Sequence, residues 1–195
     1  FVAKGNHKAS NQSGSNEKQG FGKTIYKHLM NGVSNMLPFV VAGGILIALS
    51  FLFDNREINP ANFGSNTPFA AFFKTIGDAA FGFLLPVLAG FIAVSIADRP
   101  AMVVGFVGGL LANVGGAGFL GALLAGFIAG YLVVGLKKVF SFLPSSLEGI
   151  KPVLLYPLFG TLLVGVIMTF IVNPPVAFVN QGLTNFLNGL GTSSA

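Results

Sequence analysis

The sequence predicts an all-α, polytopic membrane protein with about five transmembrane helices. Of its 195 residues, 53% are hydrophobic and only 9% are charged, whereas soluble domains carry about 25% charged residues on average. The hydrophobic residues also form long blocks, and a run of about 18 or more apolar residues is typical of a transmembrane helix. A soluble domain of this size could not cover its surface with so few charges.

Composition also excludes several kinds of site. The chain contains no cysteine, so we expect no disulfide framework and no thiolate metal site. The sequence shows no Ser-His-Asp arrangement and no metal-ligand spacing, and we therefore expect no catalytic residue, metal or cofactor in it. The net charge of +5 suggests nucleic acid as a partner, but the lysines flank apolar blocks, as membrane topology requires. A lipid bilayer, and not nucleic acid, is the expected partner.

The first part of the chain is expected to lead into the membrane. Residues 1–20 are rich in Gly, Ser, Asn, Gln and Lys, a composition typical of a flexible linker, and we expect a further domain upstream of it. An amphipathic approach segment over 21–35 precedes the first span, 36–53, which tolerates Pro38 near its start. A polar loop with Asn, Pro, Gly and Ser follows over 54–68.

The next elements are a short interfacial helix over 69–77 and a second span over 79–97. Asp78 is expected at the amino-terminal end of this span, where the helix dipole favours an anion. Pro86 lies in the middle of the span and predicts a kink.

Residues 101–136 contain no charged side chain. One helix of that length would be about 54 Å long, against a hydrocarbon core of roughly 30 Å. Gly115–Gly116 offers a break, which predicts a glycine-broken hairpin with spans over 101–114 and 117–136. The shorter arm either crosses or is re-entrant, and irregular backbone at that depth needs protein or a watery cavity around it.

The last predicted span is 153–172, which the run Asn173-Pro174-Pro175 is expected to stop. With the amino terminus in the cytoplasm and five crossings, nine lysines and arginines lie inside and two outside. A single crossing of the uncharged block would give six inside and five outside, so the positive-inside rule favours the hairpin. The nine are Lys4, Lys8, Lys18, Lys23, Lys27, Arg99, Lys137, Lys138 and Lys151, and the two are Arg56 and Lys74.

Small residues recur at intervals of four on the second arm of the hairpin. They are Gly118, Ala122, Gly126 and Gly130. Such a ridge lets membrane helices approach closely. We expect it to pack helices within the chain, with a subunit or sliding interface as the alternative.

Two polar residues are candidates for substrate binding. Glu148 is flanked by Gly149 and Pro152, so the backbone around it is not a plain helix. Its carboxylate could bind sugar hydroxyls if the loop enters the membrane. Alternatively, it pairs with Lys151 in a cytoplasmic loop. Asn113 lies near the apex of the hairpin, where it caps the broken helix or lines a substrate path.

Four stretches together resemble enzyme IIC, the membrane component of fructose-type sugar phosphotransferase systems. The stretches are YKHLMNGVSNMLPFVVAGGILIAL (26–49), PVLAGFIAVSIADRP (86–100), GAGFLGALLAGFIAG (116–130) and LPSSLEGIKPVLLYP (143–157). The resemblance implies a permease in a bacterial plasma membrane that carries fructose inward while the sugar is phosphorylated. The phosphoryl group would come from phosphoenolpyruvate through IIA and IIB domains.

The same resemblance implies that residues 1–20 join an upstream IIB domain and that 21–195 are the N-terminal part of the IIC domain. This part resembles the scaffold half of related permeases, which forms a homodimer, so most sugar-binding residues are expected outside it. Mannose, mannitol or a mannosyl-glycerate could replace fructose. A non-enzymatic half-transporter or a structural membrane scaffold is the alternative function.

Overall fold

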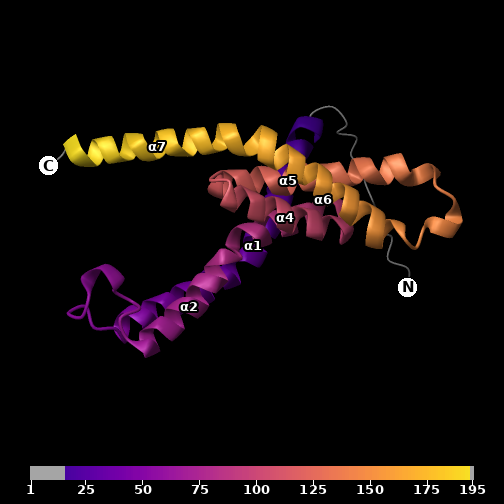
Figure 1. Ribbon diagram of the computed structural model, residues 1–195. Coiled ribbons are helices and arrows are strands. Elements are labelled where there is room, and N and C mark those ends of the chain that lie inside the picture. Colours follow the sequence, from indigo (N-terminus) through magenta and orange to yellow (C-terminus); the bar gives the residue numbers. More distant parts are fainter. Residues whose placement is uncertain (1–15, 194–195) are drawn as a thin grey trace, which may run out of the picture.

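Residues 16–193 are described by the computed structural model, and they form helices joined by turns, without a strand in that range. The main helices are α1 (Asn16–Leu52), α2 (Pro68–Gly82), α3 (Leu84–Ala97), α4 (Pro100–Val114), α5 (Gly118–Val139), α6 (Tyr156–Val166) and α7 (Asn173–Ser193) (Figure 1). Four helical stretches, 20–52, 68–97, 118–142 and 151–192, are long and apolar enough to cross a membrane. The all-α class is confirmed, while the number of crossings and a re-entrant arm stay predictions.

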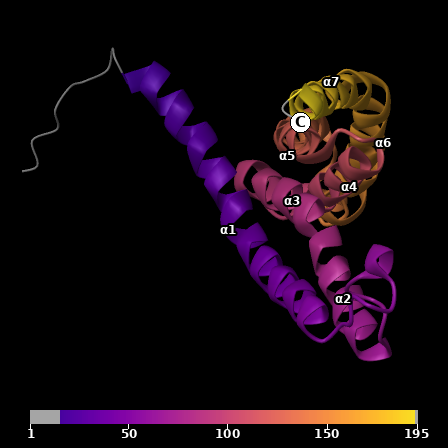
Figure 2. The same ribbon diagram turned by 90° about the vertical axis from the view of Figure 1, so that its left-hand side faces the viewer.

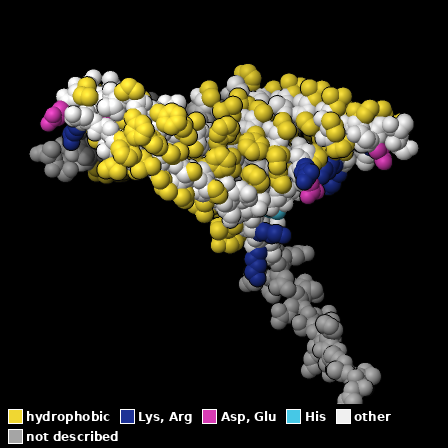
Figure 3. Space-filling model, turned by 90° about the horizontal axis from the view of Figure 1, so that it is seen from below, with side chains coloured by type: hydrophobic (Ala, Val, Ile, Leu, Met, Phe, Trp, Pro, Cys, Tyr) yellow, Lys and Arg dark blue, Asp and Glu magenta, His cyan; other side chains and the backbone are white. Residues whose placement is uncertain are grey.

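The surface agrees with a membrane environment. Hydrophobic side chains cover much of the face seen in Figure 3, and the dark blue and magenta charged side chains gather toward its ends. Exposed large hydrophobic residues occur on every main helix except the central α3, for example Val41 on α1, Leu162 on α6 and Phe178 on α7. An apolar exterior of this extent is stable in lipid and not in water.

The helix of the first span begins much earlier than predicted. α1 starts at Asn16, so the approach segment and the last five residues of the expected linker are helical; residues 1–15 lie outside the described range. Polar residues of this segment find partners on α3. The Asn31 side chain donates to the Phe91 carbonyl (2.8 Å), and His28 Nδ1 lies 2.6 Å from Ser95 Oγ. These contacts join the approach segment to α3.

The loop between α1 and α2 is organised by Asp54, which the sequence did not single out. Its carboxylate accepts hydrogen bonds from the backbone N–H groups of Gly64, Asn66 and Thr67. Partial desolvation raises the pKa of the Asp54 carboxyl, but these hydrogen bonds outweigh it and hold the pKa below its ordinary value. The loop is therefore an ordered turn rather than an open connection.

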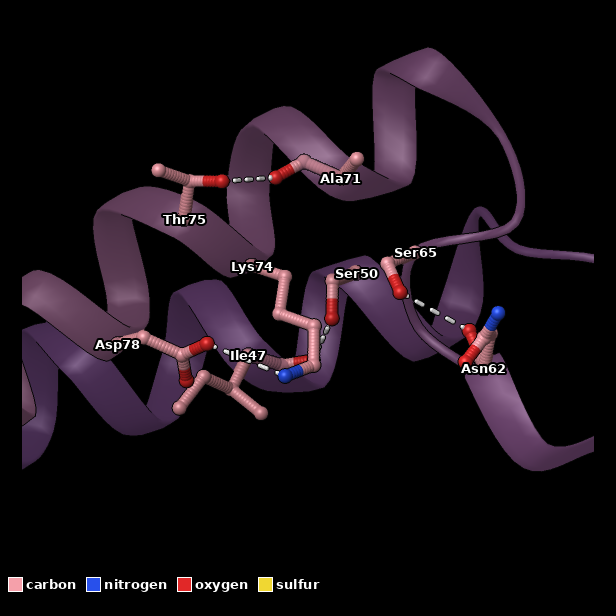
Figure 4. Close-up of polar contacts among 8 residues, drawn as sticks. All are labelled: Ile47, Ser50, Asn62, Ser65, Ala71, Lys74, Thr75 and Asp78. Carbon is pink, nitrogen blue, oxygen red and sulfur yellow. Dashed lines mark hydrogen bonds and ion pairs between the residues drawn. The ribbon is translucent and has the colours of Figure 1, made fainter.

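The expectation for Asp78 was wrong. Asp78 lies inside α2, away from any helix start, and pairs with Lys74 one turn earlier at 3.1 Å (Figure 4). The predicted interfacial helix and second span are nearly continuous, because α2 ends at Gly82 and α3 begins at Leu84. The interruption at Phe83 lies one turn before Pro86, whose missing N–H and bulky ring disrupt bonding to the Gly82 carbonyl. The predicted kink is thus found at Phe83.

α3 is the centre of the bundle. Figure 2 shows α1 on one side of it and α4, α5 and α6 on the other. Its residues Leu88, Ala89 and Ile92 are fully buried. A methyl group added at Gly105 or Gly109 of α4 would stand 2.7 Å or 2.6 Å from a backbone carbonyl oxygen of α3. The two helices therefore touch backbone to backbone, which only glycine permits.

The predicted break between α4 and α5 is confirmed. α4 ends at Val114, and Gly116 and Gly118 have φ values of +76° and +60°, a left-handed conformation that side chains disfavour. The Ala117 N–H donates to the Ala112 carbonyl at 3.0 Å, which closes the end of α4.

α7 supplies donors to this break. The Asn173 side chain donates to the Leu111 carbonyl (2.9 Å), and the Asn180 side chain donates to the Ala117 carbonyl (2.7 Å). Backbone carbonyls without a partner cost several kcal/mol in lipid. The Leu111 and Ala117 carbonyls also accept from the backbone N–H groups of Gly115 and Gly121. The carbonyl that depends on α7 is therefore that of Gly116, which accepts from Asn180 at 3.3 Å.

The predicted end of the last span was wrong. Helix continues from Lys151 through α6 and a π-helical segment, Ile167–Val172, into α7, although Asn173-Pro174-Pro175 was expected to stop it. Pro174 and Pro175 lie inside this continuous helix, where they provide no backbone N–H for the carbonyls of the preceding turn. The wider π turn before them changes the hydrogen-bonding register.

Replacing Asn180 with alanine tests the role of α7 at the break. We expect the free energy of unfolding in detergent to fall by about 1–3 kcal/mol, because the Gly116 carbonyl loses its side-chain donor and the Ala117 carbonyl loses one of its two donors. The matched control is Asn188→Ala, on the exposed part of the same helix, which should change stability by less than about 0.5 kcal/mol. Equal effects of the two substitutions would contradict the role assigned to Asn180.

Candidate functional site

The two sequence candidates for substrate binding are not brought together. Asn113 lies in the last turn of α4, exposed, and its side chain makes no hydrogen bond among residues 16–193. Glu148 follows α5 and lines a cavity together with Pro100, the first residue of α4. Because an α-helix rises about 1.5 Å per residue, Asn113 lies about 20 Å from Pro100 along the axis of α4. They lie at opposite ends of α4.

The cavity beside Glu148 has a volume of about 450 Å³. It is lined by residues from the start of α4, the last turn of α5, the connection between α5 and α6, and α6 itself. These residues are Pro100, Lys137, Glu148, Lys151, Pro152 and Tyr156. Four other cavities in the described part of the chain have only apolar residues and one threonine in their linings. The polar cavity is therefore the best candidate site.

Lys137 connects this cavity to the corner between α3 and α4. Its ammonium group donates to the Ala97 carbonyl at 2.8 Å and lies 3.7 Å from the Asp98 carboxylate. A cation at a helix C-terminus satisfies a free carbonyl and interacts well with the helix dipole. Asp98 turns the chain with a φ of +63°, unusual for a residue other than glycine. Lys137 thus fixes the corner that forms one wall.

Lys151 is the most unusual residue of the site. It is only 7% exposed, and within residues 16–193 its ammonium has no hydrogen-bond or ion-pair partner. The expected alternative pair between Glu148 and Lys151 is absent there, since the ion pairs found are Lys74–Asp78 and Lys137–Asp98. The ammonium group itself is accessible from the cavity, since among the described residues the buried side-chain atom left without a partner is Asn173 Oδ1. The cavity that Lys151 lines is where a counter-charge can be placed.

The elements around Lys151 explain its position. The turn Lys151–Leu155 is π-helical and leads into α6 at Tyr156. Phe140, just after α5, packs against the Tyr156 ring with centroids 6.2 Å apart. These contacts hold the start of α6 against the end of α5. The sequence signals for the site were two lysines and a glutamate near helix ends, but they gave no indication that Lys151 is buried.

The small-residue ridge of α5 faces the interior of this chain. Ala122 is fully buried, and a methyl group at Gly126 would stand 2.9 Å from the Ala89 carbonyl oxygen. One at Gly130 would stand 2.7 Å from the Ile96 Cβ. Gly118 differs, because it belongs to the turn and lies beside Asn180.

No group of three or more metal-binding side chains occurs among the residues that the structure describes. The chemistry that the cavity supports is non-covalent. Ammonium groups donate to an anionic or oxygen-rich ligand, and a carboxylate accepts from hydroxyl groups.

Comparison with known proteins gives relatives along most of the chain. It is 54% identical over 186 residues to the PTS system fructose-specific EIIABC component of Bacillus subtilis (strain 168), covering 95% of the chain and 29% of the relative. It is 55% identical over 127 residues to the fructose permease IIC component of Bacillus amyloliquefaciens, covering 65% and 42%. A fructose-specific EIIB'BC component of Haemophilus influenzae (strain ATCC 51907 / DSM 11121 / KW20 / Rd) is 45% identical over 186 residues, covering 95% and 33%.

The chain therefore spans less than half of the length of these curated relatives. No solved structure matches it. Residues 30–195 match the family described as "Phosphotransferase system, EIIC". Since this match covers most of the sequence, the chain belongs to the EIIC family of the phosphotransferase system.

Proposed function

We propose that this chain is the N-terminal part of the membrane component of a fructose phosphotransferase system. The complete protein carries fructose inward across a bacterial plasma membrane and delivers it as a phosphate ester. The observation that carries this proposal is the 54% identity, over 95% of the chain, to a protein named as a fructose-specific component. The apolar exterior and the four long apolar helices support the membrane location.

The chain supplies part of a phosphotransferase and not the phosphorylated residue. It has no cysteine, and IIB and IIA domains are the proposed donors of the phosphoryl group. The names of two relatives, EIIABC and EIIB'BC, describe such components in one protein. Residues 1–20 are the proposed connection to a IIB domain. A homodimer is the proposed assembly.

Within the permease, we assign this part of the chain the role of a structural scaffold. The bundle around α3 is held by close contacts between helix backbones, which suits a rigid element. Most contacts with the sugar are expected in the remaining length of the protein. A sugar contact by Glu148 or Asn113 stays a prediction for mutagenesis in the complete permease.

The proposed topology has five crossings and a cytoplasmic amino terminus. α4 is 15 residues long, or about 22 Å, which suffices only where the bilayer is thin or the helix is surrounded by protein. With α4 counted as a crossing, the cavity with Lys137 and Lys151 lies on the cytoplasmic side. The excess of lysine and arginine on that side supports this orientation.

Uptake of labelled fructose tests the proposed function. Membrane vesicles with the complete protein and its relay proteins should accumulate fructose phosphate when phosphoenolpyruvate is present inside, and almost none when it is omitted. Competition by unlabelled mannose and mannitol measures the sugar preference. Accumulation of unmodified fructose at the same rate without phosphoenolpyruvate would defeat the proposal.

Single cysteines in the cysteine-free chain test the topology. Lys138→Cys, on the exposed end of α5, should react with a membrane-impermeant maleimide only after the inner face is opened. Glu57→Cys, in the loop after α1, should react in intact cells. Labelling of position 138 from outside would exclude the five-crossing arrangement.

A further inference from the structure

The polar cavity lies beside an apolar groove on the outer face of α6. The groove has a volume of about 480 Å³ and is lined by Val153, Leu154, Pro157, Leu158, Thr161 and Leu162. Its first residue follows directly on Lys151 and Pro152, which line the polar cavity. A cationic pocket at the end of transmembrane helices therefore adjoins an apolar track along one of them.

Among the described residues the Lys151 ammonium has no partner although it lines the cavity, and this points to a ligand with a negative charge. Lys137 adds a second cation. Its ammonium group already donates to the Ala97 carbonyl and pairs with the Asp98 carboxylate, so fewer of its N–H donors are free for a ligand. The Glu148 carboxylate can accept hydrogen bonds from hydroxyl groups on the same ligand. One phosphate group with a hydroxylated substituent fits this set.

The adjoining apolar groove indicates which class of molecule bears that phosphate group. Val153 is 77% exposed and Leu162 is 62% exposed, so the track can accept a long apolar chain. Basic pockets between transmembrane helices on the cytoplasmic side are places where anionic lipid headgroups bind. Free phosphate or a sugar phosphate would leave the groove unused.

We propose that this cavity binds the headgroup phosphate of an anionic glycerophospholipid, with an acyl chain lying along α6. Lys151 contacts the phosphate, and Glu148 accepts hydrogen bonds from headgroup hydroxyls. The lipid thereby supplies a counter-charge to the Lys151 ammonium in the cavity and secures the start of α6 against the end of α5. This proposal assigns Glu148 to a lipid headgroup instead of to the sugar, and it does not depend on the proposed sugar transport.

The test measures phosphatidylglycerol bound to the complete, delipidated protein in detergent by native mass spectrometry. Lys151→Gln should weaken binding at least roughly fivefold, since one cation near a lipid surface contributes about 1 kcal/mol. The matched control, Lys138→Gln, removes the same charge from an exposed position and should weaken binding less than about twofold. Lys151→Arg should restore most of the affinity.

Further arms separate the possible sources of the phosphate. Leu158→Gln should weaken binding of phosphatidylglycerol, because a polar group enters the acyl-chain track; this variant also serves if Lys151→Gln does not fold. Inorganic phosphate or fructose 1-phosphate at the lipid's concentration should not displace it. Displacement by either compound, or equal losses in Lys151→Gln and Lys138→Gln, would overturn the proposal.

Discussion

Direct contact of helix backbones with α3 is the interaction on which the rest of the structure depends. Lipid chains are as apolar as leucine, so helices in a bilayer associate through close packing rather than through the hydrophobic effect. Gly105 and Gly109 of α4 and Gly126 of α5 leave no room for even one methyl group against α3. A branched side chain at any of these positions would separate the helices and remove many contacts at once.

This packing also positions both ends of the bundle. At one end, α4 and α5 are joined by a glycine turn whose carbonyls receive hydrogen bonds from Asn173 and Asn180 of α7. At the other, Lys137 bonds to the last carbonyl of α3 and brings the end of α5 to the corner with α4. The cavity around Lys151 is a consequence of that corner and of the turn that begins α6.

The sequence was sufficient for features that depend on local chemistry. The uncharged block over 101–136 and its Gly115–Gly116 pair predicted a helix break where the structure has one, and Pro86 predicted the interruption found at Phe83. Features that depend on distant partners were missed. The hydrogen bond from Asn31 of α1 to the Phe91 carbonyl of α3 is one of them, because it joins residues 60 positions apart.

In the candidate site, too, a feature with a local sequence signal was predicted and a feature that depends on distant packing was not. Glu148 was identified from its flanking glycine and proline, and it does line the polar cavity. The burial of Lys151 could not be predicted, because it arises from packing between α4, α5 and α6. A lysine at the edge of an apolar block is ordinarily solvated, so its sequence position carried no sign of a site.

The central claim requires α4 and α5, which both touch the α3 backbone, to meet within one subunit, and a disulfide between their small-residue faces tests this most directly. A methyl group at Gly108 would stand 3.2 Å from the Ala125 Cβ, close to the spacing of about 3.8 Å in disulfides. Oxidation of the Gly108→Cys/Ala125→Cys double variant, in a chain without other cysteines, should give an internal cross-link at the mass of one subunit. Formation of covalent dimers alone would show that these faces join subunits and would contradict the account.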